Sequence, residues 1–239
     1  MNTVIVIVLF ALPLAVQSAK KTESFWDKVL RIAGVSATPS SLRGEEKPAS
    51  GDIWVTAAAP DSVAQRLTRE GGYTSPVFDF KQPSILALKG GDLYRVPLQG
   101  EAPAKVRSLT GVIKLVGVSR DDADQLLVLT KEPIGGSSAA LLSIHTGALT
   151  AIAHDPQSKE DEMMLAHLAG WERVFGDVRL YCEDNEQEGA GGSTIRFTDV
   201  YLKRGNEAPI NLTNGKGVSS CQPSLSPDGK RVVFIRAVR

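Results

Sequence analysis

The 239-residue sequence predicts an all-β fold from residue 51 onward. Short apolar runs, such as "SILAL" at 84–88 and "RVVFI" at 231–235, follow one another along this region. Gly, Pro, Asp and Asn separate the runs, which is the usual punctuation of strands and turns. Many runs are apolar on both faces rather than alternating, so we expect each sheet to be covered on both sides.

A repeated pattern divides residues 51–239 into four parts. The pair Leu-Thr recurs at Leu67-Thr68, Leu109-Thr110, Leu149-Thr150 and Leu212-Thr213. A short strand precedes each pair, and three of the four strands open with Asp, at Asp52, Asp92 and Asp199. A predicted hairpin follows each pair, and the last hairpin has the turn sequence "SPDG" at 226–229. A repeat of roughly 40 to 45 residues with four strands has the period of a β-propeller blade. The sequence therefore predicts a β-propeller of four blades.

The last apolar strand, "RVVFI" at 231–235, needs a neighbour. A long apolar edge left open is a template for aggregation, and folded proteins pair or cover such edges. The strand without a blade of its own is "GDIWV" at 51–55. We predict that this N-terminal strand completes the C-terminal blade and closes the ring.

The third repeat is the longest because it contains two insertions, "HDPQSKEDEMMLAH" at 154–167 and "EDNEQEGAGGS" at 183–193. The first is rich in charge and the second in charge and glycine. Both compositions predict exposed loops.

Residues 1–19 carry no charged side chain and contain an apolar run from Val4 to Val16, followed by Lys20 and Lys21. The run is too short to span a bilayer comfortably, and small residues precede the lysines, as in a secretory signal peptide. No Lys or Arg precedes the apolar run, so an uncleaved anchor is the alternative. We expect a periplasmic or secreted protein with no transmembrane span once the signal is cleaved.

Residues 20–50 are predicted to form a short helix and a Pro/Ser-rich linker before the propeller domain at 51–239. Ser24 and Asp27 have the spacing of a capping box, and Gly34 is a helix stop. The apolar residues that mostly share one helical face are Phe25, Val29, Leu30 and Ile32. Such a helix docks either on a partner or on the rest of the protein.

The charge balance excludes some partners, because 27 basic residues face 27 acidic ones and no basic stripe favours nucleic acid. Two cysteines, Cys182 and Cys221, are too few for a disulfide framework. An oxidising compartment permits one bond between them. Both lie beside apolar segments, where a buried free thiol is the favoured interpretation.

The sequence contains no catalytic or metal-binding pattern that we would assign. A G-x-S-x-G nucleophile motif is missing, and His145, His154 and His167 are not spaced as zinc ligands, so we interpret each as a surface or turn histidine. The acidic stretch "RDDAD" at 120–124 is interpreted as a hairpin turn rather than a calcium loop. The sequence "NLT" at 211–213 matches a glycosylation acceptor but coincides with the repeat, so a structural role is preferred. We therefore expect no metal, no cofactor and no enzymatic activity.

The last repeat carries a resemblance to a known family. The string "NLTNGKGVSSCQPSLSPDGKRVVFI" resembles the WD-type repeat of the TolB-like family of periplasmic β-propellers. The stretch "LTREGGYTSPVFDFKQPSILALKGGDLYRV" is a weaker copy, with "DFKQ" in place of the turn sequence, and the two middle repeats are degenerate. The resemblance implies a binding platform in the cell envelope. Similar repeats also form the non-catalytic half of some peptidases and a few lyases.

The candidate site follows from the alignment of the repeats. The segments "GYTSPVFD", "GWERVFGD" and "SSCQPSLS" occupy the same position, at the start of a blade's inner strands, where propellers usually bind ligands around the channel mouth. Trp171 alone is expected to pack between blades. The residues predicted to bind a protein or peptide partner are Tyr73, Thr74, Ser75, Lys114, Trp171, Glu172, Arg173 and Gln222. The alternative is an enzyme or carbohydrate-binding module that uses Glu172, Arg173 and Lys114. The sequence leaves the oligomeric state open.

Overall fold

A computed structural model of the protein describes residues 23–33, 50–133, 136–215 and 217–237. The predicted signal peptide and residues 34–49 of the linker lie outside the described residues. Strands dominate the described chain, so the all-β prediction is confirmed at the level of class. The helices are α1 (Phe25–Ala33) and α2 (Lys159–Ala169), with a 3-10 turn at Ala190–Gly192. The strands are β1 (Gly51–Ala57), β2 (Gln65–Arg66), β3 (Tyr73–Phe78), β4 (Ser84–Lys89), β5 (Asp92–Pro97), β6 (Ala104–Ser108), β7 (Val112–Val118), β8 (Gln125–Lys131), β9 (Ser137–Ser143), β10 (Leu149–Ala151), β11 (Arg173–Phe175), β12 (Val178–Glu188), β13 (Thr194–Arg204), β14 (Ile210–Asn211), β15 (Ser220–Leu225) and β16 (Arg231–Ala237).

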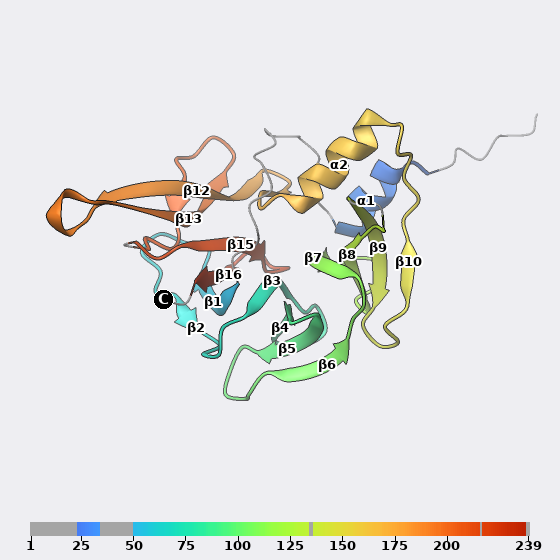
Figure 1. The fold of residues 1–239 in the computed structure, drawn as a ribbon, viewed down its shortest axis with the longest axis horizontal. Helices are drawn as coiled ribbons and strands as arrows, with labels where there is room; N and C mark the ends of the chain where they lie inside the picture. Colours follow the sequence, from blue (N-terminus) through green and yellow to red (C-terminus); the bar gives the residue numbers. More distant parts are fainter. Residues whose placement is uncertain (1–22, 34–49, 134–135, 216, 238–239) are drawn as a thin grey trace, which may run out of the picture.

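The strands form antiparallel units of four. Unit one is β3–β6, unit two is β7–β10, unit three is β11–β14, and unit four is β15, β16, β1 and β2. A single residue pair, Gly51 with Tyr73, links β1 of unit four to β3 of unit one. Figure 1 shows the units following one another around the molecule, with both helices on the side of unit two.

The N-terminal strand pairs with the C-terminal strand, which confirms the predicted pairing. β1 and β16 run antiparallel in an unbroken ladder from Gly51 opposite Ala237 to Ala57 opposite Arg231. A Cβ atom on Gly51 would lie 2.1 Å from the carbonyl oxygen of Arg236, so only glycine fits this start of the ladder. The apolar edge of β16 is therefore covered by a strand that is about 180 residues away along the chain.

Buried Asp–Thr pairs explain part of the repeated pattern. In unit four the Asp52 carboxylate accepts a hydrogen bond from the Thr68 hydroxyl at 3.0 Å, and that hydroxyl accepts one from the amide of Ile53 at 2.9 Å. Asp199 and Thr213 form the same pair in unit three at 2.6 Å. Both carboxylates are only 2% exposed. In units three and four, the Asp–Thr pair thus connects the end of the outer strand to the strand beside it.

The other two Leu-Thr pairs do not occupy this position, so their alignment was wrong. In unit one, Ser108 rather than Thr110 lies opposite Asp92 in the β5–β6 ladder. In unit two, Leu149 and Thr150 lie on the exposed outer strand β10. Ile152 takes the buried position there, with an exposed fraction of 5% against 43% for Leu149.

The two insertions in the third repeat form regular structure, which corrects the prediction of exposed loops. The first contains α2, whose N-cap Ser158 accepts a hydrogen bond from the amide of Asp161 and whose Met164 and Leu168 are buried. The second extends β12 and β13 into a hairpin paired from Val178–Arg204 to Glu188–Thr194. Figure 1 shows this ribbon projecting away from the other units. Cross-strand pairing, rather than burial, orders these polar residues.

The predicted N-terminal helix docks on the rest of the protein. Ser24 and Asp27 make the reciprocal hydrogen bonds of a capping box at 3.1 and 3.2 Å. Phe25, Val29 and Ile32 are buried in one cluster with α2 and with strands of unit two. α1 therefore contributes to the core beside β7, β8 and β9.

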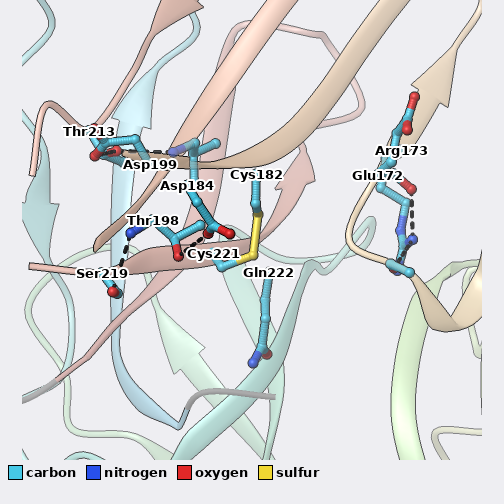
Figure 2. The surroundings of a disulfide bond; sticks show 12 residues. Glu172, Arg173, Cys182, Asp184, Thr198, Asp199, Thr213, Ser219, Cys221 and Gln222 are labelled. Atoms are coloured by element: carbon cyan, nitrogen blue, oxygen red, sulfur yellow. Dashed lines mark hydrogen bonds between the residues drawn. A yellow bond between two sulfur atoms is a disulfide. The ribbon is translucent and has the colours of Figure 1, made fainter. Parts of the chain in front are cut away.

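A disulfide joins Cys182 of β12 to Cys221 of β15, so the favoured interpretation of two buried free thiols was wrong. Figure 2 shows the bond bridging the ribbons of units three and four. Both cysteines are only half-buried. The apolar neighbours in the sequence could not reveal that two strands from different units bring the thiols within bonding range.

Three local interpretations agree with the structure. Residues 119–124 form the turn between β7 and β8, in which the amide of Asp124 donates to Asp122. The turn after β15 has Gly229 at φ 69° and a hydrogen bond between Ser226 and Asp228. Asn211 of the "NLT" sequence donates to the carboxylate of Asp199 at 3.0 Å, which supports its structural role.

Neither α1 nor α2, the α-helices of the described ranges, is long and apolar enough to cross a membrane.

Candidate functional site

The first strands of all four units meet at one pocket. Its wall includes Ser75 of β3, Leu115 of β7, Arg173 of β11 with the preceding Trp171, and Gln222 of β15. The cavity volume is about 10 Å³, which is the space of about one water molecule. The lining also includes Pro76, Val77, Val116 and Pro223, so segments far apart in the sequence contribute to one small site of mixed polarity.

The walls from β3 and β15 have matching backbone geometry. Ser75 and Gln222 adopt left-handed conformations with φ of 51° and 58°, and each precedes a proline. Few residues other than glycine adopt such angles, so the surrounding structure must hold them. The amide of Ser75 donates a hydrogen bond to Oε1 of Gln222 at 2.6 Å. Both strands contain a β-bulge here. A bulge changes the direction in which the local side chains point, and bulges are common beside functional sites.

Lys114 of β7 reaches the C-terminal end of α2. Its Nζ donates to the carbonyls of Ala169 and Gly170, the latter at 2.6 Å, and lies 3.7 Å from the centre of the Trp171 ring. The helix C-terminus and the face of an indole both attract a cation. Burial, and then the nearby charge of Arg173, lower the pKa of Lys114 well below its ordinary value. Burial therefore disfavours the charged form of Lys114, whereas a negative group beside it would favour that form.

Arg173 is the second buried cation of the site. It is 6% exposed, and its Nη1 donates to the carbonyls of Gly170 and Glu172 at 2.8 and 2.9 Å. Burial lowers the pKa of Arg173 to about 10, so the guanidinium keeps its charge at neutral pH. The neighbouring Glu172 carboxylate instead forms an ion pair with Arg179 of β12.

His167 lies near these cations and was missed as a site residue. It was expected at the surface or in a turn, but it is 9% exposed and its Nε2 has no hydrogen-bond partner among the described residues. Burial, followed by the charge of Arg173, lowers the pKa of His167. The missed signal is the helix itself, because His167 lies in the last turn of α2, which ends just before the segment that carries Arg173.

The predicted residues separate into three groups in the structure. Those that line the pocket are Ser75, Trp171, Arg173 and Gln222, while Lys114 and Glu172 contact this group. Tyr73 belongs to the core: it is 1% exposed and packs edge-on against Tyr94 at 5.9 Å. Thr74 is half-buried in the β3–β4 ladder opposite Leu88 and does not line the pocket.

Comparison with known proteins finds no matching family model and no matching curated protein. Among solved structures, the chain is similar to a putative TolB from Agrobacterium tumefaciens, with 19% identity and a TM-score of 0.37. That match covers 77% of this chain and 60% of the other, so the chain spans less than two thirds of that protein. The chain is also similar to the AtxE2 isopeptidase, both in a variant with Astexin3-dC4 bound and in the apo form, with 14% and 13% identity. The TM-scores are 0.29 and 0.28, and 72% of this chain matches 28% and 26% of the isopeptidase chains.

Proposed function

We propose that this protein is a four-bladed, TolB-like β-propeller that acts in the periplasm or outside the cell as a non-enzymatic scaffold for a protein or peptide. Two features support the propeller arrangement. The described strands form four antiparallel units, and the pairing of β1 with β16 joins the two ends of the described strand order within unit four. In a β-propeller, pairing between the first and last strands of this kind joins the ends of the ring and covers the edge of the last blade.

The observation that carries the proposal is the pocket to which each unit contributes its first strand. Its lining combines an indole, a guanidinium, a hydroxyl and an amide, from Trp171, Arg173, Ser75 and Gln222. Aromatic residues and arginine are enriched where proteins bind one another. The cavity of about 10 Å³ is too small for a metabolite, which favours a segment that lies across the mouth and inserts a small group.

The disulfide supports the proposed compartment. Disulfides persist in the periplasm and outside the cell, whereas cytosolic thiols are kept reduced. The Cys182–Cys221 bond connects two units of the fold, so we infer a structural role for it. A secretory signal at residues 1–19 would deliver the chain to such a compartment.

The alternative hypothesis for the same site is an enzymatic or carbohydrate-binding role, in which Glu172 would act directly on the ligand. We rank it lower because the Glu172 carboxylate already forms an ion pair with Arg179. The substitution Glu172→Gln would abolish turnover in an enzyme but would leave a peptide scaffold able to bind.

Site-specific cross-linking in living cells tests the scaffold role. A benzophenone amino acid replaces Ser224, which lines the pocket, and in a control replaces Val63, which is 91% exposed in the β1–β2 connection. We expect one discrete adduct from position 224 and none from position 63. Equal labelling from both positions, or none from either, would contradict the proposal.

A further inference from the structure

Two buried basic side chains at the pocket have no carboxylate partner among the described residues. Lys114 and Arg173 are 5% and 6% exposed, yet neither takes part in an ion pair among the described residues. Buried charges in proteins are normally paired, because removing a lone charge from water is costly. The acid next in sequence, Glu172, is held by Arg179.

The backbone around α2 supplies only part of the missing negative charge. The carbonyls of Ala169, Gly170 and Glu172 accept hydrogen bonds from the two cations. A helix C-terminus corresponds to about half an elementary charge, which is less than the charge of two cations. The site therefore keeps a positive potential beside the pocket.

One edge of the Arg173 guanidinium, formed by Nε and Nη2, makes no hydrogen bond to the described residues. The hydrogen bonds of Arg173 to these residues are all made by Nη1. Arg173 lines the pocket, so its Nε and Nη2 atoms are donors without a described acceptor at this site. Parallel N–H groups on one edge match the two oxygens of a carboxylate.

We propose that the pocket is a carboxylate-binding site, in which the Nε–Nη2 edge of Arg173 takes both oxygens and Lys114 supplies the second positive charge. The identification of the carboxylate's carrier as a peptide rests on the scaffold function proposed above. The cavity has the space of about one water molecule, so it holds at most the oxygen end of a ligand, which favours a planar carboxylate over the larger phosphate. Trp171, in contact with Lys114, reports occupancy of the site.

The test is an NMR titration of the full chain labelled with nitrogen-15. The probes are sodium acetate and, at equal ionic strength, sodium chloride; the signal is the indole N–H of Trp171, assigned with Trp171→Phe. We expect a saturable shift with acetate alone. Arg173→Lys keeps the positive charge but loses the parallel N–H donors of the guanidinium, so it should weaken acetate binding about tenfold or more. Arg196→Gln, which removes an 82% exposed charge on β13, should leave binding unchanged.

The results that would overturn the site are equal shifts with acetate and chloride, or unchanged acetate binding in Arg173→Lys. N-acetylglycine and N-acetylaspartate amide then distinguish a C-terminal carboxylate from a side-chain carboxylate as the source, with N-acetylglycinamide as the neutral control. Acetate binding without any adduct from position 224 would reject the scaffold function and keep the anion site. An adduct from position 224 together with no effect of acetate would reject the anion site and keep the scaffold.

Discussion

Removing the disulfide between units three and four should destabilise the whole domain by about 4 kcal/mol. The bond closes a segment with a sequence separation of 39 residues. For a loop of that length, the chain-entropy relation gives about −13 cal/mol/K, which is about 4 kcal/mol at 25 °C. Because Cys182 and Cys221 are only half-buried, serine at both positions adds little further cost.

The assay is thermal and urea unfolding of Cys182→Ser/Cys221→Ser beside the oxidised parent protein. For a domain of this size, a loss of about 4 kcal/mol lowers Tm by roughly 8 to 16 °C. The far-ultraviolet circular dichroism of the folded variant should match that of the parent, since the bond joins strands that are each already paired within their own unit.

Reduction provides the matched control. A phosphine reductant should lower the Tm of the parent protein to that of the double variant and leave the double variant unchanged. Our reasoning would be refuted if the double variant unfolded within about 2 °C of the oxidised parent. It would equally be refuted if the unfolded, unreduced parent contained two titratable thiols.

The other predictions concern the Asp–Thr pair, two glycines and the buried histidine. Thr68→Val removes both hydrogen bonds of a buried hydroxyl and should cost about 1 to 3 kcal/mol in urea unfolding, whereas Thr150→Val on exposed β10 should stay within about 0.5 kcal/mol; equal costs would contradict the pairing. Gly51→Ala places a Cβ 2.1 Å from a backbone oxygen and should cost at least about 2 kcal/mol, while Gly117→Ala meets nothing within 4 Å and should stabilise by about 0.4 to 1 kcal/mol. Burial lowers the pKa of His167 from 6.5, so the unfolded chain binds more protons below that value and stability falls as pH drops from 7 to 5; His167→Gln should flatten this dependence, and an unchanged slope would contradict it.

The sequence predicted the parts of the fold that depend on local chemistry. Asp and Thr repeat at the right spacing in units three and four because one buried pair needs both residues. The pattern failed in unit one because Ser108, two residues before Thr110, takes the position opposite Asp92. A Leu-Thr match cannot reveal this register, since it records residue types and not ladder geometry.

The missed elements have weak apolar patterns. α2 presents Met164 and Leu168 to the core but surrounds them with charged residues, so its composition resembled a loop. The β12–β13 ribbon is polar along its outer half and is held by cross-strand pairing. In both cases the tertiary environment, rather than periodicity, decides the structure.

Alignment of the repeats predicted four residues that line the candidate pocket, because it identified three of the strands that meet there. It placed Ser75, Arg173 and Gln222 in equivalent segments, and the structure brings them together. It also included Tyr73, which precedes the pocket by two residues and packs inward. The disulfide and His167 depend on contacts between separate elements, which spacing along the chain does not reveal.

In this fold the N-terminal strand β1 completes unit four, so that the units are joined at both ends of the described strand order. Hydrogen exchange of the β1 amides measures whether this pairing holds in solution. We predict that these amides exchange with the same free energy of opening as those of β16 and β4, because they open only when the whole domain unfolds. Fast exchange of β1, as in a fraying terminus, while β16 and β4 stay protected would contradict this pairing.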